Sequence, residues 1–347
     1  MSLPRLTRLA ACAVALVASL FAEETPKKVG IIGLDTSHVV AFTTVLNKGP
    51  KNPADAAKFA GFRVTHAYAQ GSKDIPESTS RVPEYAEKLK GMGVEIVGSI
   101  EQLCAQVDCV LLESNDGRVH LEQLLPVLKS GKPVFIDKPI AGSLADVIRI
   151  QDAAKQAGTL YFCSSSLRFA AGTQAVGQGS IGKVKTAHTT SPASLEPHHP
   201  DLFWYGIHAM EALYTVMGRG CQTIVRTHTP TADVVTGVWS DGRVGTMRGN
   251  IWGLMSSVSS TLVDHSCLPS DMWSAKPVTA AFDESVACTA KLLNTAATQV
   301  STVPARAWGE RAASTLAVSH VSLVAVWLGA NTRPCSPRNC CSPRNST

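Results

Sequence analysis

Short apolar runs alternate with amphipathic helical patterns through the first half of this chain, and this alternation constrains the fold more than any other feature. Residues 29–34, 109–112, 134–136 and 160–163 are apolar runs without polar alternation, as expected of strands buried on both faces. Between them, apolar residues recur at helical spacing, as in Val39, Phe42, Val45 and Leu46 and in Leu121, Leu124, Leu125 and Leu128.

Strands that alternate with helices of this length form a parallel sheet with right-handed crossovers. The sequence therefore predicts an α/β fold in which residues 27–145 form a Rossmann-type domain and residues 146–250 belong to a second α/β domain. Ligands of such sheets bind at the carboxyl ends of the strands. We therefore expect a site among the loops at 33–38, 70–74, 113–118 and 137–140.

Several helix boundaries are marked by capping residues. Ser99 can cap a short helix, and Ser143 with Asp146 resembles a capping box for a helix over 144–157 that Gly158 closes.

The loop at 33–38 occupies the place of a dinucleotide-binding glycine motif without its full sequence. Such a motif uses one glycine for the turn, a second for approach of the pyrophosphate and a third for helix packing. Gly33 keeps the first role, whereas Asp35 and His38 stand where the second and third glycines would be. Helix amides with Thr36 and Ser37 can still hold a phosphate. The loop is therefore either a modified cofactor loop or one that has lost its cofactor.

Phe62, Val64 and Tyr68 mark a further strand, the second along the chain. Its end lacks an acidic residue that would hold a ribose, since residues 70–73 read Gln-Gly-Ser-Lys. Lys73 would either favour a 2′-phosphate or be a solvated loop lysine. The choice between NAD and NADP stays open.

The stretch at 134–139 is the most specific indication of a functional site, because an acid, a lysine and a proline directly follow a buried strand. Lys138 at such a position can face a nicotinamide and exchange a hydrogen bond with a substrate hydroxyl. The alternative is a Lys-Pro turn at the surface.

Together these motifs resemble those of the glucose–fructose oxidoreductase, inositol dehydrogenase and MocA family. The similarity extends over roughly residues 28–250, with Asp-Lys-Pro at 137–139 in place of the usual Glu-Lys-Pro. Its other matches are the first strand with Gly33, the segment with Asn115 and His120, Arg168, residues 182–184, and His208 with Glu211.

The resemblance implies an NAD(P)-binding domain, a second domain with a large open antiparallel sheet, and hydride transfer between a nicotinamide and a sugar or polyol. Lys138 would orient the substrate hydroxyl, and His208 would be the proton-transferring partner. The chain departs from the family at Trp204, where an aspartate usually precedes that histidine by four residues. The implied cofactor-binding set is Gly33, Asp35, Thr36, Ser37, His38, Asn115 and Lys138. The resemblance is also compatible with a homo-oligomer.

Histidines and aromatic residues gather at 198–208. Trp204 and Tyr205 would either stack on a carbohydrate ring or pack in the core. No metal site is predicted, since the spacing of the candidate ligands is not typical of one: His198, His199, Asp201 and His208.

The two ends of the sequence differ from its body. Residues 1–22 combine two arginines, an apolar run and a small residue at the expected cleavage point, which predicts a signal peptide, export to the periplasm or medium, and no stable membrane span after cleavage. No isoleucine follows Ile251, and a Cys-Ser-Pro-Arg-Asn repeat closes the chain. We expect a poorly structured tail over 251–347 and an incomplete second sheet, from a shifted reading frame or a genuinely divergent end.

The net charge of +5 comes without a basic stripe, which argues against nucleic acid as a partner. Three hypotheses remain. The chain is an exported NAD(P)-dependent oxidoreductase of sugars or polyols, a non-enzymatic carbohydrate- or nucleotide-binding relative, or an incompletely folded product of a disrupted gene.

Overall fold

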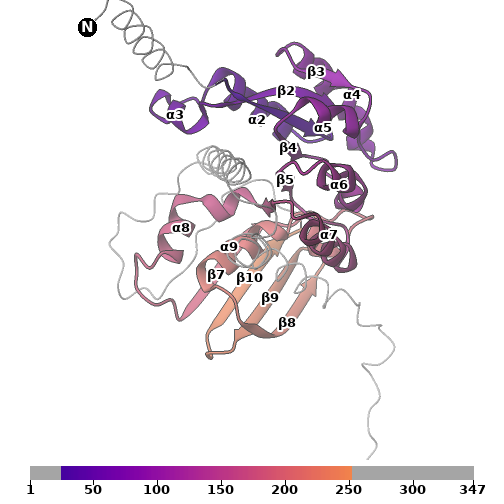
Figure 1. Cartoon of the computed structure of the whole chain (residues 1–347). Helices are drawn as coiled ribbons and strands as arrows, with labels where there is room; N and C mark the ends of the chain where they lie inside the picture. The colour runs from indigo at the N-terminus through magenta and orange to yellow at the C-terminus, as the bar shows by residue number, and fades with distance from the viewer. Residues whose placement is uncertain (1–24, 252–347) are drawn as a thin grey trace, which may run out of the picture.

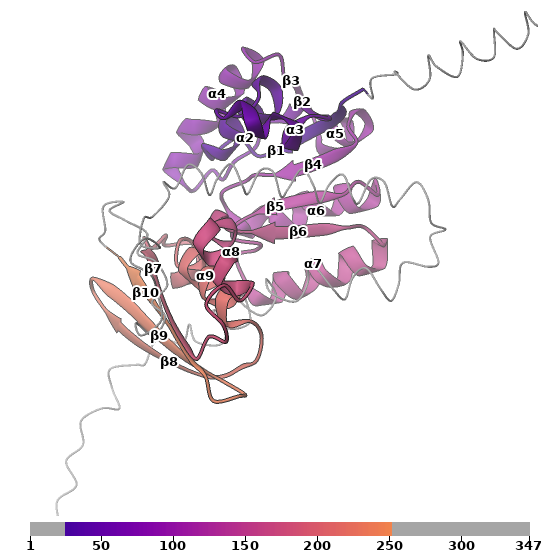
Figure 2. The same cartoon turned by 90° about the vertical axis from the view of Figure 1, so that its left-hand side faces the viewer.

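The computed structural model describes residues 25–251, in which a parallel sheet is followed by a smaller mixed sheet (Figures 1 and 2). The first sheet has six strands in the order β3-β2-β1-β4-β5-β6, all parallel to their neighbours. This arrangement confirms the predicted Rossmann-type sheet. Its strands are β1 (Lys27–Ile32), β2 (Phe62–Tyr68), β3 (Glu95–Val97), β4 (Cys109–Leu112), β5 (Val134–Asp137) and β6 (Tyr161–Ser164).

Helices cover both faces of this sheet because successive strand residues point to opposite sides. Ile31 packs in one apolar cluster and Ile32 in the other. The first cluster is shared with α2 (His38–Lys48), α3 (Ala56–Phe59) and α4 (Pro76–Lys90), and the second with α5 (Ile100–Gln106), α6 (His120–Lys129) and α7 (Leu144–Ala157). The parallel sheet also includes β6, which lies in the stretch that the sequence assigns to the second domain.

The capping signals are confirmed. Ser99 Oγ accepts a hydrogen bond from Gln102 N–H, and Ser143 Oγ accepts one from Asp146 N–H. Gly158 ends α7 in the left-handed conformation, with φ of +64°. The prediction that Leu125 lies on the buried face of α6 is wrong, because Leu125 is 50% exposed. The buried stripe instead continues through Val127, because its direction on the helix is set by contact with α5 and α7.

The second sheet has the order β7-β10-β9-β8 and packs on α9 (Ile207–Met217). Its strands β9 and β10 pair antiparallel and form a hairpin. Within this open sheet β8, β9 and β10 pair antiparallel, as expected, whereas β7 at one edge runs parallel to β10. The elements are η3 (Ser166–Phe169), α8 (Ala171–Gly177), β7 (Thr186–Pro192), η4 (Asp201–Phe203), β8 (Cys221–Thr229), β9 (Ala232–Trp239) and β10 (Val244–Asn250).

Two predictions lie outside the described residues, namely the signal peptide at 1–22 and the poorly structured tail after 251. Across residues 25–251, none of the helices has the length and apolar character needed to cross a membrane.

Candidate functional site

The site forms where the strand order reverses, between β1 and β4, because the loops that follow these strands diverge and leave a crevice at the carboxyl edge of the sheet. The loop after β5 borders the same edge. Three segments that are far apart in sequence therefore meet there.

Gly33 makes the first turn, with φ of +84°, a backbone conformation that favours glycine. A Cβ added to it would lie 2.6 Å from Ser114 Cα, so the loops after β1 and β4 touch without space for a side chain. Its position in the turn therefore requires glycine.

Asp35 is turned into the protein rather than toward a ligand. Its carboxylate accepts hydrogen bonds from Ser78 Oγ at 2.7 Å and from Asn115 N–H at 2.9 Å, and its residue is fully buried. Burial raises the pKa of this carboxyl above its ordinary value, although both hydrogen bonds oppose the shift. Asp35 ties three segments together, and its inward orientation lowers its repulsion of a pyrophosphate outside the loop.

The first turn of α2 follows directly. Thr36 Oγ1 accepts a hydrogen bond from His38 N–H at 3.4 Å, whereas Ser37 is exposed and makes no side-chain cap bond. An exposed helix start of this kind can bind an anion through its amides. Thus the Gly33 turn, the inward Asp35 and the start of α2 fit a dinucleotide phosphate.

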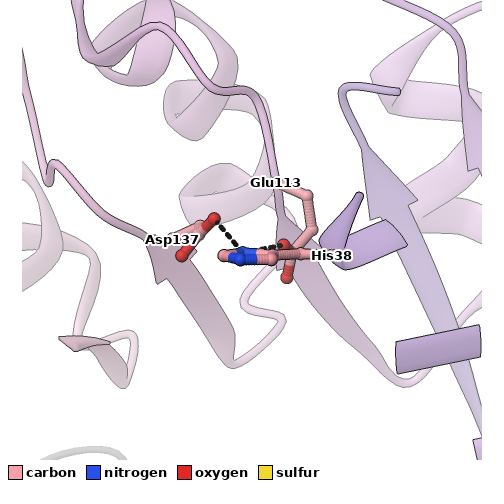
Figure 3. Close-up of side chains that lie close together, drawn as sticks. All are labelled: His38, Glu113 and Asp137. Atoms are coloured by element: carbon pink, nitrogen blue, oxygen red, sulfur yellow. Dashed lines mark hydrogen bonds and ion pairs between the residues drawn. The ribbon is translucent and has the colours of Figure 1, made fainter. Parts of the chain in front are cut away.

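His38 reaches across the edge of the sheet to two carboxylates (Figure 3). Its Nδ1 lies 2.6 Å from Asp137 Oδ2 and 4.0 Å from Glu113 Oε2. Burial and the adjacent Asp137 charge raise the pKa of Glu113 well above its usual range. Burial also opposes ionisation of Asp137, but the charges of His38 and Lys138 outweigh it and hold its pKa below the ordinary value. The edge therefore carries one imidazole and two carboxyls in a confined space.

Lys138 follows Asp137 and is almost completely buried. Its Nζ lies 4.9 Å from the centre of the Tyr205 ring and 5.9 Å from that of Trp204. Such cation–π contacts stabilise an ammonium group away from water. The aromatic pair from the second domain thus covers the lysine at the carboxyl end of β5.

His208 stands in the first turn of α9 and also contacts Tyr205, at 5.3 Å between ring centres. Its Nδ1 shares a hydrogen bond of 2.7 Å with Ser165 Oγ. Burial, and next the positive charge of Lys138, lower the pKa of His208 to about 3. The imidazole is therefore neutral near pH 7, and the structure brings both predicted catalytic residues, Lys138 and His208, against Tyr205.

Asn115 is partly buried, and its backbone N–H holds Asp35. Lys73, the residue considered for a 2′-phosphate, is exposed. Glu211 lies on α9 with its Oε2 3.0 Å from Arg168 Nε, which links the helix to η3.

A buried charge network connects the loop after β4 with the second domain. Asp116 lies 2.7 Å from Arg118 Nη2 and 3.1 Å from His199 Nε2, and it also accepts from Ser72 Oγ. His199 Nδ1 in turn lies 2.6 Å from Glu196. His199, considered as a metal ligand from the sequence, instead lies between the carboxylates of Asp116 and Glu196.

The sequence reasoning missed Glu113 and Ser165 as site residues. Glu113 directly follows the buried strand β4, the same signal that singled out Lys138 after β5, and it could have been found by that rule. Ser165 after β6 carried no local signal beyond its position.

Comparison with known proteins identifies the first domain. A family model described as an oxidoreductase family with an NAD-binding Rossmann fold, the Gfo/Idh/MocA family, matches residues 27–165. Residues 27–165 belong to this family. The matched part contains the six-stranded parallel sheet and all residues of the site except those from the second domain.

Two curated relatives are similar to this chain. An uncharacterized oxidoreductase from Streptococcus pneumoniae is 26% identical over 42% of this chain and 44% of its own length. The 1,5-anhydro-D-fructose reductase of Ensifer adhaerens is 32% identical over 35% of this chain and 37% of its own length. The matched stretch therefore spans less than half the length of these relatives.

The fold is also similar to that of a solved oxidoreductase from Agrobacterium radiobacter in complex with NAD⁺, L-tartaric acid and magnesium. The TM-score is 0.59 at 15% identity, covering 89% of this chain and 98% of the other. This likeness shows the α/β fold.

Proposed function

We propose that this chain is an NAD(P)-dependent oxidoreductase that acts on a CH–OH group of a sugar or polyol. The observation that carries the proposal is that Lys138, at the carboxyl end of β5, and His208 both lie against the ring of Tyr205. Family membership of residues 27–165 supports the cofactor class, as does the bound NAD⁺ of the Agrobacterium protein.

The Gly33 turn, Ser37 and the amides at the start of α2 would hold the phosphates of the dinucleotide. When bound, the nicotinamide accepts or donates the hydride. Thr36, His38 and Asn115 line the same edge and would border the cofactor.

Oxidation of an alcohol removes a hydride from carbon and a proton from oxygen, so a nearby group must take the proton. The Lys138 ammonium would donate a hydrogen bond to the substrate oxygen and orient it. His208, neutral near pH 7, would accept the hydroxyl proton at the ring nitrogen that does not bond Ser165. A positioned proton-transfer group contributes about 10²–10⁴-fold to the rate.

Trp204 and Tyr205 support a carbohydrate as the substrate class. Both rings are partly exposed beside Lys138, so that polar and aromatic surfaces adjoin. The apolar CH face of a sugar ring packs on aromatic faces while its hydroxyls bond polar groups. The reductase name of the Ensifer relative supports the same class. The leader-like sequence at 1–22 supports action outside the cytoplasm.

The test measures NAD⁺ and NADP⁺ binding by calorimetry and turnover on a panel of sugars and polyols. Lys138→Ala and His208→Ala should each abolish turnover, with nucleotide binding less affected by the histidine change. Lys132→Ala removes a partly buried lysine at the opposite end of β5 and should leave turnover unchanged. Full activity of either site variant would refute the assigned roles.

One observation favours a second function, a carbohydrate- or nucleotide-binding protein without catalysis. His38 places a side chain where the third glycine of the motif normally allows close packing, and it is tied to Asp137. A parent protein that binds sugar but neither nucleotide would support this alternative.

A further inference from the structure

We propose that His38, Glu113 and Asp137 bind a divalent first-row transition metal ion, of the class of Mn²⁺ and Zn²⁺. His38 begins α2 after β1, Glu113 directly follows β4 and Asp137 ends β5, and the three side chains converge at the carboxyl edge of the parallel sheet (Figure 3). This site goes beyond the proposed hydride transfer and does not depend on it.

The geometry of the cluster matches the reach of one ion. One donor atom from each residue can be chosen so that all three lie within 4.8 Å of one another. His38 Nδ1 and Glu113 Oε2 are 4.0 Å apart. Ligands on opposite sides of one such ion are separated by about 4.2 Å, twice a metal–ligand distance of about 2.1 Å. If His38 Nδ1 releases its hydrogen bond to Asp137, a small movement of the three side chains toward one another is therefore enough for all three to bind one ion.

Glu113 provides an independent indication of a missing partner. Its residue is fully buried, yet neither carboxylate oxygen has a hydrogen-bond partner among the described residues. A buried carboxylate without compensation is costly, since desolvation is not repaid by hydrogen bonds. The side chain points into the space beside His38 (Figure 3). A cation at this position would supply the compensation.

Lys138 does not fill this role in the described part of the chain. Within residues 25–251, no carboxylate oxygen lies within 4.0 Å of its Nζ, which instead rests on the Tyr205 and Trp204 rings. Among residues 25–251, the imidazole of His38 is therefore the only cationic or basic side chain at ion-pair distance from these two carboxyls.

The donor set selects the class of ion. Imidazole nitrogen suits transition metals, whereas carboxylates suit Mg²⁺, Ca²⁺ and Mn²⁺. A mixed set of one nitrogen and two carboxylates therefore favours Mn²⁺ or Zn²⁺ over Mg²⁺. Three protein ligands leave coordination positions open for water or a substrate oxygen. The His38 side chain is 27% exposed, so solvent reaches the cluster.

The experiment titrates chelator-treated full-length protein with Mn²⁺ and follows free Mn²⁺ by electron paramagnetic resonance. Mn²⁺ is the probe because the ten cysteines of the chain would compete for Zn²⁺, whereas thiolates bind Mn²⁺ poorly. We expect one equivalent to bind, with Mg²⁺ at least tenfold weaker in competition. Glu113→Gln and Asp137→Asn should each weaken Mn²⁺ binding at least tenfold.

Asp233→Asn is the matched control. Asp233 is also a buried aspartate beside a histidine, 3.0 Å from His228 Nδ1, but it lies on the second sheet. Its substitution should leave Mn²⁺ affinity unchanged. The proposal is overturned if the parent protein binds no stoichiometric Mn²⁺, or if Glu113→Gln binds it as tightly as the parent. Nucleotide binding is measured separately, so failure of the metal site leaves the proposed oxidoreductase function standing.

Discussion

Asp116 offers a sharp test of the contacts between the loop after β4 and the segment that precedes α9. Its residue is 1% exposed, and its carboxylate meets Arg118 and His199 besides Ser72. Asp116→Asn keeps the shape of the side chain and removes its charge. Hydrogen bonds to charged groups contribute about 1.5–3 kcal/mol, and breaking a buried ion pair costs about 3–5 kcal/mol. In the variant Arg118 keeps its ion pair with Asp74 at 2.8 Å, so its charge is not left without a partner. We therefore expect the free energy of unfolding to fall by about 2–3 kcal/mol.

The pH dependence of this loss follows from the direction of the pKa shift. Burial alone would raise the pKa of Asp116, but the contacts with His199 and Arg118 outweigh it and hold the pKa well below its ordinary value. The folded state therefore binds fewer protons than the unfolded chain, in which the pKa is about 3.9. The stabilisation is complete above that value and is lost as the pH falls below it, by up to about 1.4 kcal/mol per pH unit.

The assay is urea unfolding followed by tryptophan fluorescence and circular dichroism between about pH 7 and pH 3.5, the window set by the unfolded pKa. The difference between parent and Asp116→Asn should be constant down to about pH 5 and then narrow. Asp74→Asn is the control, since its side chain is 51% exposed and solvent screens such a surface pair, so its substitution should change stability much less than Asp116→Asn does. A difference that stays constant or widens at acid pH would contradict the assigned charge network.

Four further substitutions test the fold around the site by thermal and urea unfolding. Gly33→Ala should destabilise the protein by more than about 1–2 kcal/mol, because the turn is left-handed and the added Cβ meets Ser114. It should also weaken nucleotide binding. An unchanged midpoint of unfolding would refute this reasoning. Ser143→Ala should cost about 1 kcal/mol through loss of the cap of α7, and no loss would show that the cap is unimportant. Leu124→Ala should lower the free energy of unfolding by about 2–5 kcal/mol because Leu124 is fully buried. Leu125→Ala on the same helix should change it by less than about 0.5 kcal/mol because Leu125 is exposed. Equal effects of the two substitutions would contradict the observed orientation of α6.

The sequence by itself determined the local elements of the first domain. Apolar runs such as 109–112 and caps such as Ser143 depend on neighbouring residues alone, and the structure confirms both. Position after a buried strand was enough to single out Lys138, because the end of a parallel strand is exposed to a ligand whatever its neighbours are.

Only the tertiary structure decided which of these strand ends meet. Placing β1 beside β4, and β4 beside β5, brings His38, Glu113 and Asp137 together across 99 residues of sequence, and no local pattern encodes that order. Likewise, the inward turn of Asp35 depends on Ser78 from a distant helix, and the exposure of Leu125 depends on which helices flank α6. Hydrophobic periodicity identifies the buried face of an element from adjacent residues, whereas pairing and burial among elements are settled by contacts between segments far apart in the chain.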